Sequence, residues 1–190
     1  MKIRDATLQD ARAIRDIYRP YVESTAITFE YDAPDEAEFV RRMSFTLKEY
    51  PYLVAVLNGR VVGYAYAACF HAREAYRHTV EISIYLSMDC RGKGIGVRLY
   101  EELEKRLIRQ NVFVMYACIT TSPRSDDKYL NDSSIRFHER NGFRLIGSHD
   151  RCGYKFDQWY GVIWMEKEIA PRPEKPAPFI PFPETDREML

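Results

Sequence analysis

The spacing of hydrophobic residues changes along the chain, and each change marks an expected element. Residues 79–86, TVEISIYL, alternate between two sets of side chains, which predicts a β-strand with two different faces. The apolar face carries Val80, Ile82, Ile84 and Leu86, and the other carries Thr79, Glu81, Ser83 and Tyr85. We therefore expect one apolar and one polar face.

The N-terminal half reads as three strands and two helices. A strand over residues 2–5 precedes a helix entered at Thr7, where Asp10 three residues later resembles a capping box. A second helix is expected to start at Pro34, because acidic residues follow in its first turn. The runs YLVAVL and RVVGYAYAACF flank an Asn-Gly pair at 58–59, which predicts a β-hairpin.

The C-terminal half alternates helices and strands. An apolar helical stripe follows three closely spaced glycines, and the continuous apolar run at 112–119 predicts a strand buried on both faces. SSIRFHERNGF reads as a short helix that ends at the Asn-Gly pair 141–142. Strands around 143–148 and 159–167 then close the sheet. The predicted fold class is α/β, with a central mixed sheet flanked by helices.

One domain and a tail are expected. The chain has 190 residues, 46% of them hydrophobic, so residues 1–169 can bury a sizeable core. The segment 170–190 carries 6 prolines within residues 171–183, so it should be extended and lie outside the core. Because Phe179, Ile180 and Phe182 stand among the prolines, the tail either docks on a neighbouring surface or subunit or stays disordered.

The composition limits which classes of binding partner are expected. Lys+Arg and Asp+Glu both number 28, and this balance argues against binding to nucleic acid or an anionic membrane, which depends on excess positive charge. No apolar run approaches the roughly 20 residues that span a bilayer, and the first residues lack the apolar segment of a signal peptide, so we expect a cytoplasmic protein. The four cysteines are widely separated and the histidines do not cluster, so neither a metal site nor a disulfide framework is indicated.

Candidate chemistry concentrates in RGKGIG, residues 91–96, directly ahead of a predicted helix. Glycine lets backbone N–H groups approach a ligand, and a helix N-terminus carries partial positive charge, so the segment suits a phosphate. Arg91 and Lys93 reinforce that charge. A dinucleotide fingerprint would read GxGxxG and a triphosphate loop GxxxxGK followed by Ser or Thr, and neither is present, so the expected pyrophosphate belongs to another ligand. A flexible basic turn is the alternative interpretation.

Five segments together resemble one known family. RGKGIGVRLYEEL is similar to the acyl-CoA pyrophosphate loop of the GNAT family of N-acetyltransferases. With it, ITFEYDAPDEAEFVRRM, AREAYRHTVEISIYL, NDSSIRFHERNGF and YKFDQWYGVIWMEK resemble the phosphinothricin acetyltransferase subgroup. The resemblance runs in one order from residue 2 to about residue 168.

The resemblance implies acetyl-CoA as the cofactor and a fold in which two neighbouring parallel strands, EISIYL and VFVMYACI, part to admit the pantetheine arm. The first strand would pair with the pantetheine, the glycine segment with the pyrophosphate, and an Asn-x-x-Ser pattern would add further contacts. The implied coenzyme contacts are Ile84, Tyr85, Leu86, Arg91, Gly92, Lys93, Gly94, Ile95, Gly96, Asn131 and Ser134.

Acetylation of an amine needs a base, because an amine with a pKa of about 9 to 10 is mostly protonated at neutral pH. Glu81 is the expected base, since it lies on the polar face of a strand in an otherwise apolar sheet and its Thr-Val-Glu context resembles the subgroup's base position. A solvated or salt-bridged carboxylate is the alternative. His138 stands where many relatives have a tyrosine that protonates the departing thiolate, and imidazole titrates near neutrality. A structural histidine is the alternative there.

The acceptor site is implied by ITFEY and AREAYRHT, which flank the amine pocket in the subgroup. By this similarity the substrate candidates are Phe29, Glu30, Arg73 and Tyr76. Arginine binds a carboxylate through two hydrogen bonds, which suits an amino-acid-like acceptor. Alternatively, Arg73 pairs with a surface acid, and Phe29 and Tyr76 are packing residues.

The leading function is acetyl-CoA-dependent N-acetylation of a small amino-acid-like amine, such as phosphinothricin, methionine sulfoximine, methionine sulfone or an amino acid. Acetylation of a protein or peptide amine is the second, and a non-catalytic acyl-CoA-binding regulatory module is the third. The family resemblance also implies a homodimer. Three features depart from the subgroup. The segment TSPRSDDKY lengthens the connection into the NDSS helix, Asp157 and Gly161 stand where the subgroup tends to have Gly and Asp around its closing tryptophan, and the prolines beyond Ala170 have no counterpart.

Overall fold

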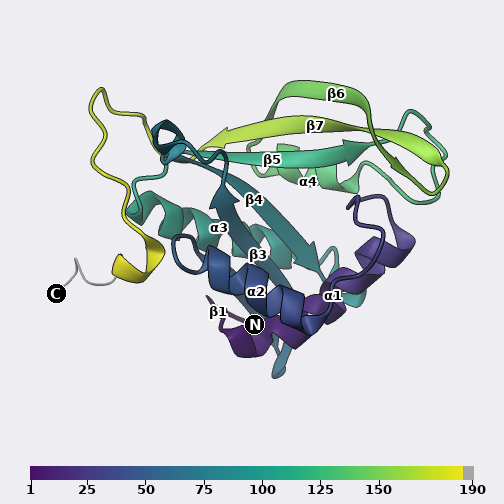
Figure 1. Ribbon diagram of the computed structural model, residues 1–190, viewed down its shortest axis with the longest axis horizontal. Helices are drawn as coiled ribbons and strands as arrows, with labels where there is room; N and C mark the ends of the chain where they lie inside the picture. Colours follow the sequence, from purple (N-terminus) through teal and green to yellow (C-terminus); the bar gives the residue numbers. More distant parts are fainter. Residues whose placement is uncertain (186–190) are drawn as a thin grey trace.

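The computed structural model describes residues 1–185 as one mixed sheet with helices on both faces (Figure 1). The strands are β1 (Lys2–Asp5), β2 (Tyr52–Leu57), β3 (Arg60–Cys69), β4 (Thr79–Leu86), β5 (Val114–Thr121), β6 (Arg144–Lys155) and β7 (Gln158–Glu168). The helices are α1 (Ala11–Ser24), α2 (Glu36–Thr46), α3 (Ile95–Arg109) and α4 (Ser133–Arg140), and the 3-10 turns are η1 (Leu8–Asp10), η2 (Glu74–Tyr76), η3 (Met88–Cys90) and η4 (Phe182–Glu184). This architecture confirms the predicted fold class.

Two buried clusters hold the helices against opposite faces of the sheet. α1 and α2 bury Ile14 and Met43 in one cluster with Tyr64 of β3. α3 buries its apolar stripe, including Leu99, in the other cluster with Val80 of β4. No helix within residues 1–185 is long and apolar enough to cross a bilayer.

The strand order is β1-β2-β3-β4-β5-β7-β6, and β4 and β5 run parallel at its centre. These two strands pair over only three residues, from Thr79 opposite Val114 to Glu81 opposite Tyr116. Beyond that point β4 continues along β3 to Leu86, and β5 continues along β7 to residue 121. Since each strand follows its outer neighbour, a gap opens between them, which confirms the expected parting.

The two hairpin turns differ in whether their residues predict a turn. Asn58 and Gly59 have φ of 51° and 78°, as a two-residue turn of this hand requires, so the predicted hairpin is confirmed. Phe156 and Asp157 also have positive φ, 50° and 59°, and lead β6 directly into β7. Because no glycine marks this second turn, β6 was expected to end near residue 148, whereas it runs from 144 to 155.

Two predicted boundaries are wrong by two residues. α2 starts at Glu36 rather than Pro34, because the Asp35 carboxylate caps it by accepting the Glu38 N–H at 2.8 Å. β5 starts at Val114 rather than at residue 112, and it is not buried on both faces, since Cys118 is exposed. The parting of β4 leaves that side of β5 uncovered.

The proline-rich segment has no helix or strand from residue 169 to residue 181, in agreement with an extended chain. It does not stay apart from the core, however, because Phe179 packs against the cluster that α3 buries. Figure 1 shows it returning along the domain from the end of β7, near α3. The surface on which it docks therefore belongs to its own chain.

One buried cation joins the two halves of the fold. The side chain of Lys155, at the end of β6, is only 3% exposed. Its Nζ donates to the carbonyl oxygens of Val22, Thr25 and Thr28 at 2.7, 2.9 and 2.8 Å. The last carbonyls of a helix lack partners within it, so this ammonium satisfies the end of α1 and ties the following loop to β6.

Replacing Lys155 with methionine is expected to lower the free energy of unfolding by about 2 to 5 kcal/mol, because three carbonyls lose their donor in a buried place. Equilibrium urea denaturation measures the change. Lys48→Met is the matched control, since the Lys48 side chain is exposed and makes no hydrogen bond within residues 1–185. A loss of the same size in both variants would contradict the assigned role of Lys155.

Candidate active site

The glycine segment forms a turn whose amides are free. Gly92 and Gly94 have φ of 72° and 75°, in the left-handed region, and α3 begins directly afterwards at Ile95. Within the described part of the chain, the N–H groups from Arg91 to Gly96 donate to no other protein group. Free amides at a helix N-terminus attract an anion, so the geometry suits the predicted pyrophosphate.

A cavity of about 200 Å³ leads from this turn along the end of β4. Its lining includes Ile84, Leu86, Arg91, Gly92, Gly96 and Ser134. A second cavity continues between the parted strands, lined among others by Ser83, Cys118 and His138. Because Ile84 and Ser134 line both, one path joins the glycine turn to the gap between β4 and β5.

Gly96 sets the width of that path. A Cβ atom at this position would stand 3.0 Å from the Phe137 ring of α4 and 3.4 Å from Ile84. Any side chain there would therefore push α4 away from α3 or fill the cavity. The glycine lets the two helices approach while the space beside them stays open.

The edge of β4 that faces the gap offers backbone groups at Ile84 but not at Leu86. The Tyr21 hydroxyl donates to the Leu86 carbonyl at 2.6 Å and accepts the Leu86 N–H at 3.2 Å. In a strand, residues two apart direct their backbone groups to the same side, so those of Ile84 face the gap while those of Tyr85 face β3. Of the three predicted strand contacts, only Ile84 therefore has a free backbone toward the gap.

The two predicted cations differ in position. The Arg91 guanidinium lies over the Tyr21 ring, 4.8 Å from its centroid, and its Nε donates to the Tyr21 hydroxyl at 3.3 Å. Arg91 thereby stands at the cavity. Lys93 instead donates to the Asp89 carbonyl at 2.8 Å, which ties its ammonium back to η3.

At the start of α4, the serines line the cavities and the asparagine does not. Ser134 lines both cavities, and Ser133, which the sequence interpretation missed, lines the one beside the glycine turn. Asn131 is exposed, and its Oδ1 accepts the Ser133 N–H at 2.9 Å. The asparagine therefore shapes the entry into α4 and lines neither cavity.

Glu81 is half-buried at the last residue pair before β4 and β5 part. Within residues 1–185 its carboxylate has no hydrogen bond and no ion pair, so the salt-bridged alternative is not observed. Burial raises the pKa of Glu81 above its ordinary value, and the charge of His71 acts in the opposite direction. A carboxylate with free oxygens and a raised pKa is suited to accept a proton.

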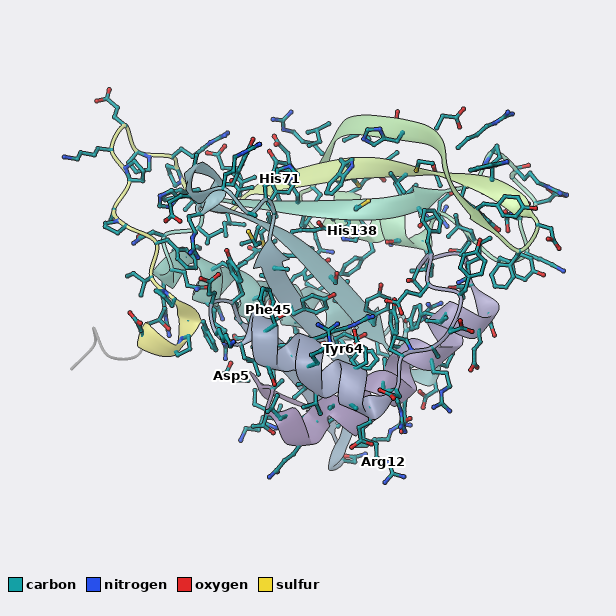
Figure 2. All side chains as sticks on the ribbon, viewed as in Figure 1. Asp5, Arg12, Phe45, Tyr64, His71 and His138 are labelled. Carbon is teal, nitrogen blue, oxygen red and sulfur yellow. The ribbon has the colours of Figure 1, made fainter. Side chains whose placement is uncertain are left out.

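His71 is not among the predicted site residues, but its charge acts on Glu81. It lies just after β3 and is labelled in Figure 2. Its ring centroid lies 4.2 Å from that of Phe70 and 4.9 Å from that of Tyr76. The register of β3 on β4 was the signal that could have found it, because Ala68, opposite Glu81, comes three residues earlier.

His138 lines the gap from α4 and is only 4% exposed (Figure 2). Its Nδ1 lies 2.7 Å from the Ser134 carbonyl, which can only accept, so Nδ1 carries a hydrogen. Nε2 then accepts the Tyr100 hydroxyl hydrogen at 2.9 Å. Burial lowers the pKa of His138, which favours the neutral ring, and both ring nitrogens have hydrogen-bond partners.

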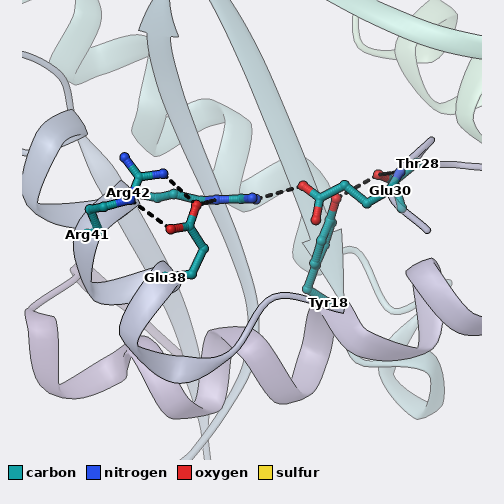
Figure 3. A network of polar contacts seen from close by, with 6 residues as sticks. All are labelled: Tyr18, Thr28, Glu30, Glu38, Arg41 and Arg42. Carbon is teal, nitrogen blue, oxygen red and sulfur yellow. Dashed lines mark hydrogen bonds and ion pairs between the residues drawn. The ribbon is translucent and has the colours of Figure 1, made fainter. Parts of the chain in front are cut away.

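Phe29 and Glu30 lie in the connection from α1 to α2. The Phe29 ring fills the space beside Gly153, where a Cβ atom would meet it at 2.2 Å. Glu30 pairs with Arg42 at 2.7 Å, and Arg42 also pairs with Glu38, as Figure 3 shows. This network borders a cavity lined by several aromatic rings, among them Tyr18, Tyr64 and Tyr66.

Arg73 and Tyr76 lie together in a different place, the connection from β3 to β4. The Arg73 side chain is exposed and has no partner within the described residues, so the predicted alternative of a surface ion pair is not observed. Tyr76 packs edge-on against Phe70, with ring centroids 5.9 Å apart. The four substrate candidates thus form two groups on two connections.

The thiol of Cys118 also lines the gap. Partial desolvation of the thiol by the surrounding protein, together with the charge of Glu81, raises the pKa of Cys118 to about 11. A protonated thiol is a poor nucleophile, so this cysteine does not favour an acyl-enzyme intermediate. Residues 1–185 contain no group of three His, Cys, Asp or Glu side chains placed to hold a metal ion.

Comparisons with known proteins agree with this geometry. Residues 3–164 match the family model described as the acetyltransferase (GNAT) domain. The chain is 33% identical over 178 residues to the phosphinothricin N-acetyltransferase of Streptomyces viridochromogenes, with 93% of each chain covered. It is 34% identical over 178 residues to the L-methionine sulfoximine/L-methionine sulfone acetyltransferase of Pseudomonas aeruginosa, covering 92% of this chain and 98% of the other.

A solved structure extends the likeness to three dimensions. The GNAT superfamily phosphinothricin acetyltransferase of Sinorhizobium meliloti, in complex with AcCoA, has a TM-score of 0.81 and 37% identity, covering 95% of this chain and 97% of that one. Parted central strands, a glycine turn with free amides and a matching family domain lead to one assignment. The chain belongs to the GNAT family of acetyltransferases and uses acetyl-CoA.

Proposed function

We propose that this N-acetyltransferase acts on the amine of a small amino-acid-like molecule such as phosphinothricin, methionine sulfoximine, methionine sulfone or an amino acid. The relatives act on acceptors of this kind by their names. The single observation that carries the proposal is the unpaired, half-buried Glu81 at the point where β4 and β5 part. Acetyl-CoA supplies the activated acetyl group, and the chain supplies the base and the binding sites.

In this proposal the glycine turn and β4 hold the coenzyme. The free N–H groups between Arg91 and Gly96 bind the pyrophosphate, with Arg91 adding charge at the cavity. The backbone of Ile84 pairs with an amide of the pantetheine arm, and Ser134 lines the same path. This arrangement directs the thioester end toward the gap beside Glu81.

Glu81 removes a proton from the ammonium of the acceptor, and the neutral amine then attacks the thioester carbonyl. The C–S bond breaks as the coenzyme leaves as a thiolate, and the second proton of the attacking nitrogen passes to solvent. The raised pKa of Glu81 brings its affinity for the proton closer to that of the amine. Arg73, exposed and without a partner within residues 1–185, binds the acceptor carboxylate. Phe29, Glu30 and Tyr76 border the acceptor.

His138 serves the departing thiolate through Tyr100. When protonated, its Nε2–H donates to the Tyr100 oxygen, which frees the Tyr100 hydroxyl hydrogen for the thiolate in the gap. The proton thus passes from the imidazolium to the phenol oxygen while the phenol hydrogen passes to sulfur. Because burial lowers the pKa of His138, this step favours the lower side of neutral pH.

The proposal is tested by incubating the protein with acetyl-CoA and a panel of amino acids and their sulfone, sulfoximine and phosphinate analogues, while thiol release is followed. At least one small amine is expected to give amine-dependent release. Release only with peptides would favour the second function. Tight coenzyme binding without release from any amine would favour a regulatory binding module.

Glu81→Gln is expected to lower kcat/KM about 10²- to 10⁴-fold, because the amide cannot accept the proton, while the Kd for CoA stays unchanged. In the wild type, kcat/KM should fall as the pH drops through the raised pKa of Glu81, since the base is active only when ionised. That acidic limb should be absent in the variant. Glu101→Gln, on the exposed face of α3, is the control and should retain full activity.

Gly94→Ala is expected to raise the Kd for CoA about 5- to 50-fold, because an alanine at φ of 75° is strained and shifts the free amides. Isothermal titration calorimetry measures the affinity. Gly59→Ala is a matched control, since this turn has φ of 78° and, like Gly94, has open space where Cβ would lie. Equal CoA affinity in both variants would argue against a pyrophosphate site at the glycine turn.

A homodimer formed through the β6 edge completes the proposal. β6 is the last strand of the sheet, and Leu145 and Trp159 on this hairpin are 59% and 51% exposed. Light scattering should give twice the 22.4 kDa of one chain. Leu145→Asp should shift the protein toward a monomer, whereas Ile108→Asp, at an exposed apolar site on α3, should not.

A cytoplasmic location also forms part of the proposal. Three of the four cysteines, Cys69, Cys118 and Cys152, are exposed and unpaired, as in a reducing compartment. Acetyl-CoA is the required donor, and it has to be present where the enzyme works.

A further inference from the structure

The C-terminal segment is held to the domain by backbone hydrogen bonds. The Ile180 N–H donates to the Gln110 carbonyl at 3.1 Å, and the Gln110 side-chain amide, fully buried, donates to the Ile180 carbonyl at 2.9 Å. The Phe182 N–H donates to the Glu49 carbonyl at 2.9 Å. These bonds fix the position of the segment along the domain, so each of its side chains has a defined location.

One of those side chains meets a cation. The Phe179 ring lies between Tyr50, whose ring centroid is 5.5 Å away, and Arg77, whose guanidinium carbon is 5.1 Å from the ring centroid. On its other side, the Arg77 guanidinium pairs with Glu49 at 2.7 Å and Glu74 at 3.1 Å. Phe179 of the tail and Glu49 of the α2–β2 connection therefore jointly fix the position of the Arg77 guanidinium.

Arg77 closes the turn that carries two of the acceptor candidates. Its N–H donates to the Glu74 carbonyl, and the Tyr76 N–H donates to the Arg73 carbonyl, both at 3.0 Å. The Tyr76 ring in turn packs on His71, whose charge acts on Glu81. A series of contacts thus leads from the tail to His71, and the charge of His71 acts on Glu81.

At its start the connection is held by Phe70, which packs against Tyr116 and Trp164, and by the Cys69 thiol, which donates to the His71 carbonyl at 2.8 Å. A cavity lies under it, lined by Tyr50, Glu49, Arg73 and Arg77 among others, and residues 71–76 are exposed. An exposed segment over a cavity keeps one conformation only if side chains at its ends are anchored. Arg77 is such an anchor, and Phe179 is the tail residue that holds its guanidinium in place.

We propose that the proline-rich tail is a positioning element of the acceptor site, in which Phe179 acts through Arg77 to hold Arg73, Tyr76 and His71 in place. This inference rests on the proposed function, in which Arg73 and Tyr76 of the β3–β4 connection contact the acceptor. The hydrogen bonds and ring contacts that residues 178–182 make with the domain go to Glu49, Tyr50, Arg77, Gln110 and Asn111, and within the described residues none of them goes to the glycine turn or Ile84. Loss of the contact therefore affects the acceptor and leaves the coenzyme site intact.

Steady-state kinetics of Phe179→Ala in the full chain test the proposal. The KM for the acceptor should rise about 3- to 10-fold, while the KM for acetyl-CoA changes less than about 2-fold. Phe179→Trp keeps an aromatic face for Arg77 and should restore the acceptor KM. Lys175→Ala, at an exposed tail position, is the control. Equal increases of both KM values, or an unchanged acceptor KM, would overturn the proposal.

A double-mutant cycle separates an effect through Arg77 from a general loss of packing. If Phe179 acts through Arg77, the acceptor KM of the variant carrying both Phe179→Ala and Arg77→Ala should equal that of Arg77→Ala alone. Multiplied effects of the two substitutions would show that they act separately, and would contradict the inference.

Limited proteolysis gives a result that does not depend on finding the acceptor. Trypsin cleaves after arginine, so cleavage after Arg73 and Arg77, followed by mass spectrometry, reports how firmly the connection is held. Phe179→Ala should accelerate these cleavages relative to Lys175→Ala, even if no amine on the panel is acetylated. If no amine is acetylated but cleavage is accelerated, the proposed function is contradicted and the role of the tail is not. If cleavage is unchanged, the proposed role of the tail is contradicted.

Discussion

The structure depends on where hydrogen bonding between β4 and β5 stops. Up to Glu81 the two strands share a parallel ladder, and beyond it each keeps only its outer neighbour. Backbone groups in the middle of a sheet are costly to leave without partners, so such a gap needs something to occupy it. Tyr21 satisfies Leu86 at one end. The free groups of Ile84 and of the glycine turn then offer a line of donors and acceptors that a long polar coenzyme arm can follow.

The parting of β4 and β5 also determines the surroundings of the Glu81 carboxylate. Where β4 and β5 part, the Glu81 carboxylate is half-buried and has no partner within residues 1–185. Its pKa is raised for that reason. Around Glu81, partial desolvation raises the pKa of Cys118 and burial lowers that of His138, and both shifts favour the neutral side chain. In the proposed mechanism, Glu81 is therefore the group around the gap that acts as the base.

Local patterns predicted most of the fold, because periodicity and turn residues act over short distances. The Asn58-Gly59 hairpin and the strand from Thr79 to Leu86 followed directly from them. The long β6–β7 hairpin was missed because Phe156 and Asp157 adopt positive φ without a glycine. The glycine turn and Glu81 could be recognised from motifs, but the role of Tyr21 at Leu86, the charge of His71 on Glu81 and the docking of Phe179 on Arg77 could not. Each depends on a contact between segments distant in sequence, which spacing alone does not reveal.

The most direct test of the central claim is an experimental structure of the protein with bound CoA. The account predicts pyrophosphate oxygens about 2.7 to 3.2 Å from the N–H groups between Arg91 and Gly96, and the thiol in the gap between β4 and β5 beside Glu81. It would be contradicted by CoA bound elsewhere on the molecule. It would also be contradicted by a gap closed by pairing of β4 with β5 beyond Glu81 and Tyr116.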